Sequence, residues 1–205
     1  MTLTKDRIRK GRKFEQVLDG ARTIFLADGF EGASVDAIAK QAGVSKATLY
    51  SYFPDKRRLF TEVGRIECLR QAEAAKTSVD KTAPPRVVLG QAAKHITQFL
   101  LSDFAQAVFR VCVAESDRFP DLGREFYESG PRVGKKVLCD YLTEATACGA
   151  LEIQDIDLAA HQFMALCKAE IFDKRVFGVQ HSFTEAEVDR IIDSAVDMFL
   201  SRYEA

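Results

Sequence analysis

The sequence predicts an all-α protein in which a small N-terminal three-helix domain with a helix-turn-helix is followed by a larger helical domain. Apolar residues recur at helical spacing along most of the chain, and no segment alternates polar and apolar residues for long, as a strand would. The chain has 205 residues, so a small first domain leaves roughly 150 residues for a second core. The two parts are expected to span residues 1–58 and 59–205.

The first helix is expected from Phe14 to Ala27, and Gly29 and Phe30 close it. One face of this helix carries apolar residues at helical spacing, namely Phe14, Val17, Leu18, Ala21, Ile24 and Phe25. Before it, the first 13 residues form a basic arm with Lys5, Arg7, Arg9, Lys10, Arg12 and Lys13.

Two short helices joined at Gly43 follow, between Ser34 and Phe53. Ser34 is expected to cap the first of them, whose apolar stripe consists of Val35, Ile38, Ala39 and Ala42. Gly43 suits a steep turn because glycine adopts positive φ at low cost. Ser45 is expected to cap the second helix, while Val44 and Leu49 point back to the core.

The second short helix leaves several side chains free of packing, namely Lys46, Ala47, Thr48, Tyr50 and Tyr52. A helix of about seven residues is about 10 Å long and fits a DNA major groove about 12 Å wide. Lysine and tyrosine can bind phosphate oxygens, and a threonine can contact a base. One alternative is that the motif is a helical hairpin of the core that does not bind DNA. A second alternative, for Tyr50 or Tyr52, is that the ring packs beneath the motif.

Charge is unevenly distributed in a chain whose net charge is −1. Residues 1–58 carry +5, and the remainder carries −6. Clustered cations supply much of the affinity of proteins for DNA through counterion release, and an acidic remainder stays off the DNA. Although charge runs are often only solvated faces, this one coincides with the helix-turn-helix and favours DNA binding.

These features resemble the DNA-binding domain of the TetR family of bacterial transcriptional repressors over about residues 12 to 60. The resemblance rests on the basic arm, a helix ending in A-D-G-F, the segment S-V-D-A-I-A-K-Q-A-G-V-S-K-A-T-L-Y-S-Y-F, and P-D-K-R-R-L-F from Pro54. The segment A-E-S-D-R-F-P-D-L-G-R-E-F-Y-E-S-G-P resembles a ligand-domain type of proteobacterial members. Ala47 departs from the glycine that many members carry there, which leaves the operator sequence open.

The resemblance implies a homodimer that binds a palindromic double-stranded DNA operator and is released by a small-molecule effector. Lys46, Ala47, Thr48 and Tyr50 match groove-facing positions, and Tyr50, Tyr52 and Lys56 match phosphate contacts. With the two capping serines, the candidate DNA-binding residues are Ser34, Ser45, Lys46, Ala47, Thr48, Tyr50, Tyr52 and Lys56.

Beyond Pro54, which suits a helix N-terminus, the pattern stays helical to the end of the chain. A fourth helix runs from the first domain into the second and ends before Ala83, so it connects the two. Further helices are expected at about 86–101, 103–117, 121–148 with a bend at Gly130-Pro131, 155–177 and 184–203.

The middle helices carry many large apolar groups with a few polar or soft ones among them. That mixture suits either an effector pocket or an ordinary core. The candidate ligand-binding residues are His95, Phe99, Phe109, Cys112, Glu115, Phe126, Phe163 and Cys167.

The last two helices are apolar over more than one face, which requires two neighbours for each. The resemblance implies that a twin subunit supplies the second neighbour through a four-helix interface, and an intramolecular core is the alternative. The candidate interface residues are Phe163, Leu166, Val188, Ile192, Ala195 and Phe199.

Other function classes find little support in the sequence. Three isolated histidines, with no G-x-S-x-G, Gly-rich loop or H-x-x-x-H, argue against an enzyme, and no cofactor or metal is implied. Five cysteines without CxxC spacing argue against a disulfide framework, although a thiol sensor using Cys112, Cys139, Cys148 or Cys167 stays open. Without a long apolar run or signal sequence, we expect a cytoplasmic protein with no membrane partner.

Overall fold

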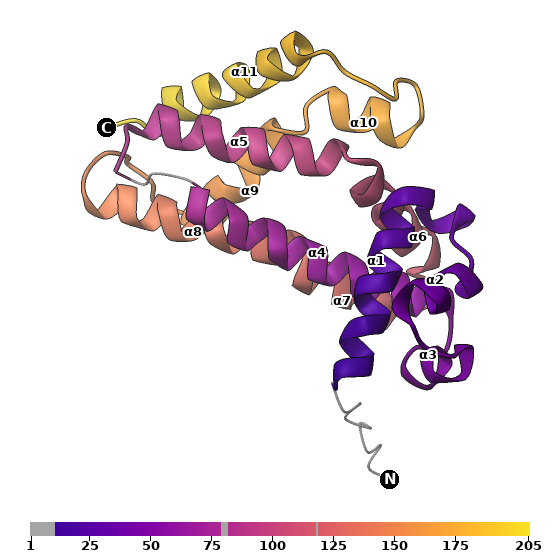
Figure 1. Cartoon of the computed structure of the whole chain (residues 1–205). Helices are drawn as coiled ribbons and strands as arrows, with labels where there is room; N and C mark the ends of the chain where they lie inside the picture. Colours follow the sequence, from indigo (N-terminus) through magenta and orange to yellow (C-terminus); the bar gives the residue numbers. More distant parts are fainter. Residues whose placement is uncertain (1–10, 79–81, 118) are drawn as a thin grey trace.

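The computed structural model describes residues 11–78, 82–117 and 119–205, and it is helical throughout these ranges apart from connections and one isolated bridge between Leu151 and Glu204. The all-α prediction is therefore confirmed (Figure 1). The helices are α1 (Arg12–Gly32), α2 (Val35–Ala42), α3 (Lys46–Tyr52), α4 (Lys56–Ser78), α5 (Pro85–Leu101), α6 (Asp103–Glu115), α7 (Pro120–Ser129), α8 (Pro131–Ala147), α9 (Ile156–Leu166), α10 (Ile171–Val176) and α11 (Glu185–Tyr203).

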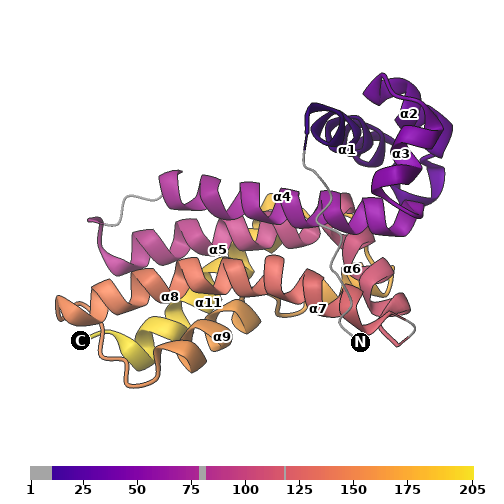
Figure 2. The same cartoon turned by 90° about the horizontal axis from the view of Figure 1, so that it is seen from below.

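The helices α1, α2 and α3 form a bundle at one end of the molecule, beside the beginning of α4 (Figures 1 and 2). Their shared core is apolar and closely packed, with Val17, Ile38 and Leu49 fully buried. The basic arm lies outside the described residues up to residue 10, and Arg12 and Lys13 are exposed at the start of α1. The three-helix domain expected from the apolar stripes is thus confirmed.

The first helix is longer than expected because apolar residues beyond Ala27 extend its packing. It continues to Gly32 through a kink at Gly29, where φ is 69°. The kink turns Phe30 toward the core, where its ring lies 4.9 Å from that of Phe60. Phe60 also meets Phe25 edge-on at 4.7 Å, so α4 is fastened to the first domain by aromatic packing.

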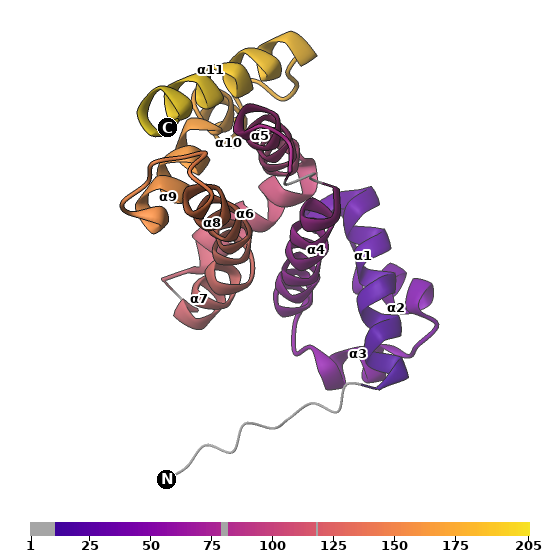
Figure 3. The same ribbon diagram turned by 90° about the vertical axis from the view of Figure 1, so that its left-hand side faces the viewer.

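The second part of the molecule is a layered helical bundle, seen end-on in Figure 3. Helices α5, α8, α9 and α11 enclose a core that includes Leu89, Leu142, Phe163 and Phe199. Helix α4 lies along the side of this bundle that faces α1 (Figure 3). The expected bend at Gly130-Pro131 is confirmed, because α7 ends at Ser129 and α8 begins at Pro131.

The single helix expected over 155–177 is wrong. Helix α9 ends at Leu166, and Glu170 adopts φ 63° and ψ −54°, the conformation of a rare three-residue γ-turn. The amide of Ile171 closes this turn on the carbonyl of Ala169 at 2.6 Å. Ion pairs from Lys174 and Arg190 hold the Glu170 carboxylate, so tertiary contacts break a pattern that contains neither glycine nor proline.

Within the described residues, no single helix has both the length and the hydropathy of a membrane span, and α5 and α6 reach them only as a pair bent by 65°.

Candidate DNA-binding surface and effector cavity

Helix α3 is held by the short turn at Gly43 and by a serine cap. Gly43 has φ 63°, as expected for the turn, and the hydroxyl of Ser45 accepts a hydrogen bond from the amide of Thr48 at 3.1 Å. The Ser34 hydroxyl caps α2 in the same way, accepting from Ala37 at 3.0 Å. Both caps satisfy free amides at helix N-termini, so the two serines fix where α2 and α3 begin.

Helix α3 packs through Leu49, which is fully buried, and leaves its opposite face open. Lys46, Ala47 and Tyr50 are exposed on that face. The half-buried Thr48 has its hydroxyl 2.9 Å from that of Ser45. This face combines cations, hydroxyls and a methyl group, which are the groups that read and hold DNA in a major groove.

Lys46 forms an ion pair with Asp36 of α2, with Nζ and Oδ1 2.5 Å apart. The hydrogen bond and charge of Asp36 raise the pKa of Lys46, so the ammonium stays charged. Because both side chains are largely exposed, a phosphate or base edge can replace the carboxylate at small cost. The sequence did not predict this pairing of Lys46 with Asp36, which lies one helix earlier on the same surface.

The two tyrosines of α3 have different surroundings. Tyr50 is 48% exposed and free to reach outward. Tyr52 is half-buried, and its ring meets that of Phe14 edge-on with centroids 5.6 Å apart. Packing therefore orients Tyr52, as in the alternative raised from the sequence, while Tyr50 stays on the open face of α3.

Lys56, expected to contact phosphate, is used within the protein. Its ammonium donates to the carbonyls of Phe30 and Ala33 at 2.8 and 3.1 Å and lies 4.5 Å from the centre of the Phe30 ring. These contacts tie the start of α4 to the end of α1. An ammonium has three N–H groups, so one donor is left for a phosphate.

Contacts across α4 and α6 connect the first domain to the second. Arg57 at the start of α4 donates to Glu115 at the end of α6 at 2.7 Å, and Arg22 of α1 donates to Glu67 of α4 at 2.8 Å. Gly64 lies against Val108 of α6 so closely that a Cβ there would meet it at 2.9 Å. Helix α6 is therefore in close contact with α4, the helix that leads out of the first domain.

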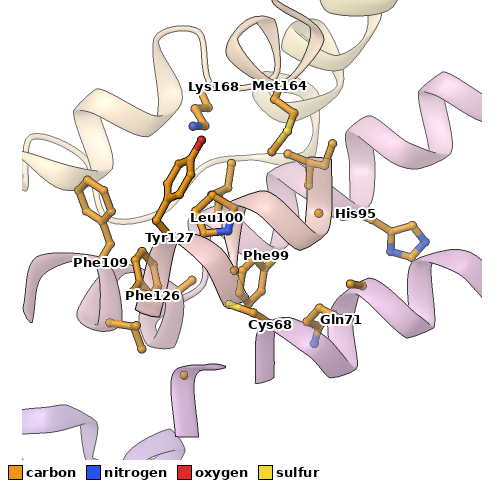
Figure 4. A pocket seen from close by; sticks show the side chains of 18 of the residues that line it. Cys68, Gln71, His95, Phe99, Leu100, Phe109, Phe126, Tyr127, Met164 and Lys168 are labelled. Carbon is orange, nitrogen blue, oxygen red and sulfur yellow. The ribbon is translucent and has the colours of Figure 1, made fainter. Parts of the chain in front are cut away.

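A cavity of about 610 Å³ lies between α4, α5, α6, α7 and α8 and reaches the break between α9 and α10 (Figure 4). Phenylalanines make up much of its wall, including Phe99, Phe109 and Phe126. The volume is in the range of pockets that hold drug-sized ligands. Its walls also include residues of α4 and α6, so a ligand in the cavity contacts the elements that connect the two domains.

A buried amide group with an open acceptor lies behind the wall of the cavity. The Nε2 of Gln106 donates to the carbonyl of Leu100 at 2.7 Å, which fixes the orientation of the amide. Its Oε1 is buried with no hydrogen-bond partner among the described residues. Gln106 has no accessible surface, so a ligand in the cavity does not reach this acceptor in the present arrangement of the helices.

Five of the eight candidate ligand-binding residues line the cavity, namely His95, Phe99, Phe109, Cys112 and Phe126. The other three expectations are corrected. Glu115 is engaged by Arg57, Phe163 is fully buried against Phe199, and Cys167 is buried in the core of the second domain. A charged partner and core packing, neither visible in the helical spacing, account for these three positions.

The cysteine surroundings do not favour a thiol sensor. Burial raises the pKa of Cys68 to about 12, that of Cys112 to about 11 and that of Cys167 to about 12. Burial also raises the pKa of Cys139, while Cys148 is exposed. Reactive thiols require a lowered pKa together with exposure, so the four thiols with raised pKa values are poor nucleophiles.

The apolar residues expected at a subunit interface belong largely to the core of one subunit. Phe163, Ile192, Ala195 and Phe199 are at most 6% exposed. Leu166 and Val188 are half-buried and pack against the same core. The expectation for the four buried residues is therefore corrected, because α5 and α8 already supply the second neighbour that the wide apolar arcs require.

Two family models match this chain in succession. Residues 17–63 match the model described as bacterial regulatory proteins, tetR family, and residues 87–205 match the C-terminal domain of AefR-like transcriptional repressors. The first match covers α2, α3 and the start of α4, and the second covers the helices from α5 onward.

Solved structures and curated relatives agree with these matches. A TetR-family regulator from Mesorhizobium loti has 26% identity and a TM-score of 0.79, covering 96% of this chain and 99% of its own. The flavonoid-responsive regulator FrrA has 36% identity and a TM-score of 0.70, covering 95% and 98%. The repressor AcnR of Corynebacterium efficiens is 36% identical over 59 residues, which are 29% of this chain and 31% of that relative.

Proposed function

Because this chain belongs to the TetR family of bacterial transcriptional regulators, we propose that it is a dimeric repressor that binds a palindromic operator through α3 and is released by a small, largely apolar effector. The observation that carries the DNA-binding half is the exposed face of α3, where Lys46, Thr48 and Tyr50 lie opposite the buried Leu49. Two such helices in a dimer would read two half-sites separated by one turn of DNA or a multiple of it.

Lys46→Ala and Tyr50→Phe are each expected to lower operator affinity, by about tenfold for Lys46, because each loses a contact to a base or phosphate. Asp36→Ala removes the internal partner of Lys46 and is expected to retain affinity. Fluorescence anisotropy with operator DNA, identified from sites bound in the source genome, measures the three variants. Undiminished affinity in both Lys46→Ala and Tyr50→Phe, with unchanged melting temperatures, contradicts the assignment of α3.

The effector is proposed to be aromatic and to carry at least one hydroxyl group. The cavity wall is rich in phenylalanine. FrrA, which is 36% identical over nearly the whole chain, is a flavonoid-responsive regulator. A flavonoid-like phenol has the aromatic body that this cavity suits, and the likeness to FrrA supports its hydroxyl groups.

Release requires that the effector bind more tightly to the arrangement that does not fit the operator. To change the ratio of the operator-binding arrangement to the other arrangement from 99:1 to 1:99, the effector must bind the second more tightly by about 5.5 kcal/mol. Contacts to Val108 of α6 and Gly64 of α4 offer a route, because both line the cavity and touch each other. An effector that separates these helices would move α4 and change the spacing of the two α3 helices.

Gly134→Phe is expected to give a repressor that binds its operator normally but no longer responds to effector. Gly134 of α8 lines the cavity, and a Cβ there meets no atom within 4 Å, so a larger side chain fills cavity space without a clash. Release of operator DNA is measured while a hydroxyflavone is added, with Gly134→Ala as the matched control. An unchanged response in Gly134→Phe would place the effector elsewhere.

A further inference from the structure

The described residues that line the cavity include basic side chains but no acidic ones. Among the described residues that line it there is no aspartate or glutamate, whereas Lys168 and His95 supply basic groups. His95 is exposed at the rim, while Lys168 is half-buried at the end near α10. A cavity of this kind has no group to neutralise a cationic ligand, and it therefore favours neutral or anionic ones.

Lys168 lies in the break between α9 and α10. It lies two residues before Glu170, the residue with positive φ, and Phe172 lies two residues after it. Both Lys168 and Phe172 line the cavity, and the Lys168 ammonium lies 5.6 Å from the centre of the Phe172 ring. The amide of Phe172 also donates to the carbonyl of Lys168 at 3.2 Å, so the two residues keep the i, i+4 spacing of a helix and face the same side.

Ion pairs outside the cavity hold the strained turn at Glu170. The Glu170 carboxylate pairs with Lys174 at 2.6 Å and with Arg190 of α11 at 2.5 Å, and neither cation lines the cavity. A non-glycine residue in this backbone region is strained and persists where the surroundings hold it, often at ligand sites. The two ion pairs thus hold Lys168 in place while leaving its ammonium unengaged by them.

The ammonium of Lys168 has a different environment from the neighbouring lysines. Lys135 pairs with Asp157 at 2.7 Å, and Lys174 pairs with Glu170. In the described part of the chain, no carboxylate lies within ion-pair distance of Lys168. Figure 4 shows the hydroxyl of Tyr127 from α7 directed toward this ammonium at the edge of the cavity.

We propose that Lys168, with the hydroxyl of Tyr127, binds an acidic group of the effector, which is thereby an aromatic weak acid that binds as its phenolate or carboxylate. This inference rests on the proposed effector-binding function and adds a charge requirement to it. The apolar body of the ligand would lie among Phe99, Phe109 and Phe126, and its anionic group at the end marked by Lys168. Ionic hydrogen bonds are about twice as strong as neutral ones, so Lys168 would select the ionised form.

Two fluorescent probes with one skeleton test this inference. 1-Anilinonaphthalene-8-sulfonate is an anion, and N-phenyl-1-naphthylamine is the same molecule without the sulfonate. Wild-type protein is expected to bind both, and Lys168→Met is expected to lower affinity for the anion by about tenfold because an ionic hydrogen bond is lost. Affinity for the neutral probe is expected to stay unchanged, because methionine keeps the length and apolar stem of the side chain.

Lys168→Arg keeps the charge and is expected to retain binding of the anion. Lys94→Met, which removes the charge of an exposed lysine on α5 outside the cavity, is the matched control. Unchanged anion binding in Lys168→Met overturns the inference, as does an equal loss for both probes or the same loss in Lys94→Met. If wild-type protein binds neither probe, the effector cavity of the proposed function fails, and the inference falls with it.

Discussion

The double variant Leu158→Glu/Met198→Glu is expected to separate the proposed dimer into monomers. We expect its operator affinity to fall by about a hundredfold or more, because linking two half-site contacts raises affinity by about 10²–10⁴. Leu158 of α9 and Met198 of α11 are 51% and 57% exposed, although both are large and apolar. The opposite faces of the same helices are buried within the subunit. The exposed faces are therefore the part of α9 and α11 that remains for a twin subunit.

Sedimentation velocity measures the dimer, and operator binding is measured in parallel. Leu69→Glu is the matched control, because it places the same charge on an exposed leucine of α4, a helix that packs against neither α9 nor α11 in the main contacts of the fold. We expect the control to remain dimeric with wild-type affinity. A double variant that still sediments as a dimer would exclude these faces from the interface.

The difference between this surface and the residues expected from the sequence has a clear physical cause. Periodicity shows that Phe163 and Phe199 are buried but not which neighbour buries them. Their rings meet edge-on at 5.1 Å within one subunit, so both are core residues. Apolar residues left outside, such as Leu158, belong to the same helical pattern, so periodicity alone does not separate them from the core.

Local chemistry made the helix-turn-helix predictable in detail. The caps at Ser34 and Ser45 and the positive φ of Gly43 depend on residues within three positions of each site, and all three predictions are confirmed. Leu49 as the inward residue of α3 follows from the same spacing. By contrast, the pairing of Lys46 with Asp36 depends on the angle between two helices, which spacing does not determine.

Long-range ion pairs account for most of what was missed in the candidate site. Glu115 was a pocket candidate, but Arg57, 58 positions earlier in the chain, engages it. Glu170 lies within a sequence that continues the helical pattern, and Arg190 of α11 helps to hold it in the γ-turn. Periodicity locates apolar faces but not the surroundings of a lysine, so the basic group that Lys168 brings to the cavity could not be predicted from it.

Replacing glycine by alanine is expected to have opposite effects at two positions. Gly20 of α1 faces α2, and a Cβ there would lie 2.7 Å from the backbone nitrogen of Ala42 and 2.8 Å from its Cα. Backbone cannot yield as a flexible side chain does, so Gly20→Ala must push α2 away from α1. Overpacking of this kind costs about 1–3 kcal/mol, and it also tilts α3, since the turn at Gly43 follows Ala42 directly.

Gly90 of α5 gives the matched comparison, because a Cβ there meets no atom within 4 Å. Alanine at this interior helical position is expected to stabilise the protein by about 0.5–1 kcal/mol through helix propensity alone. Urea unfolding measures both variants, and anisotropy measures their operator affinity. Gly20→Ala is expected to lose both stability and operator binding, whereas Gly90→Ala keeps operator binding and gains stability. Equal stability and equal operator affinity in the two variants would contradict the close contact between α1 and α2 on which the orientation of α3 depends.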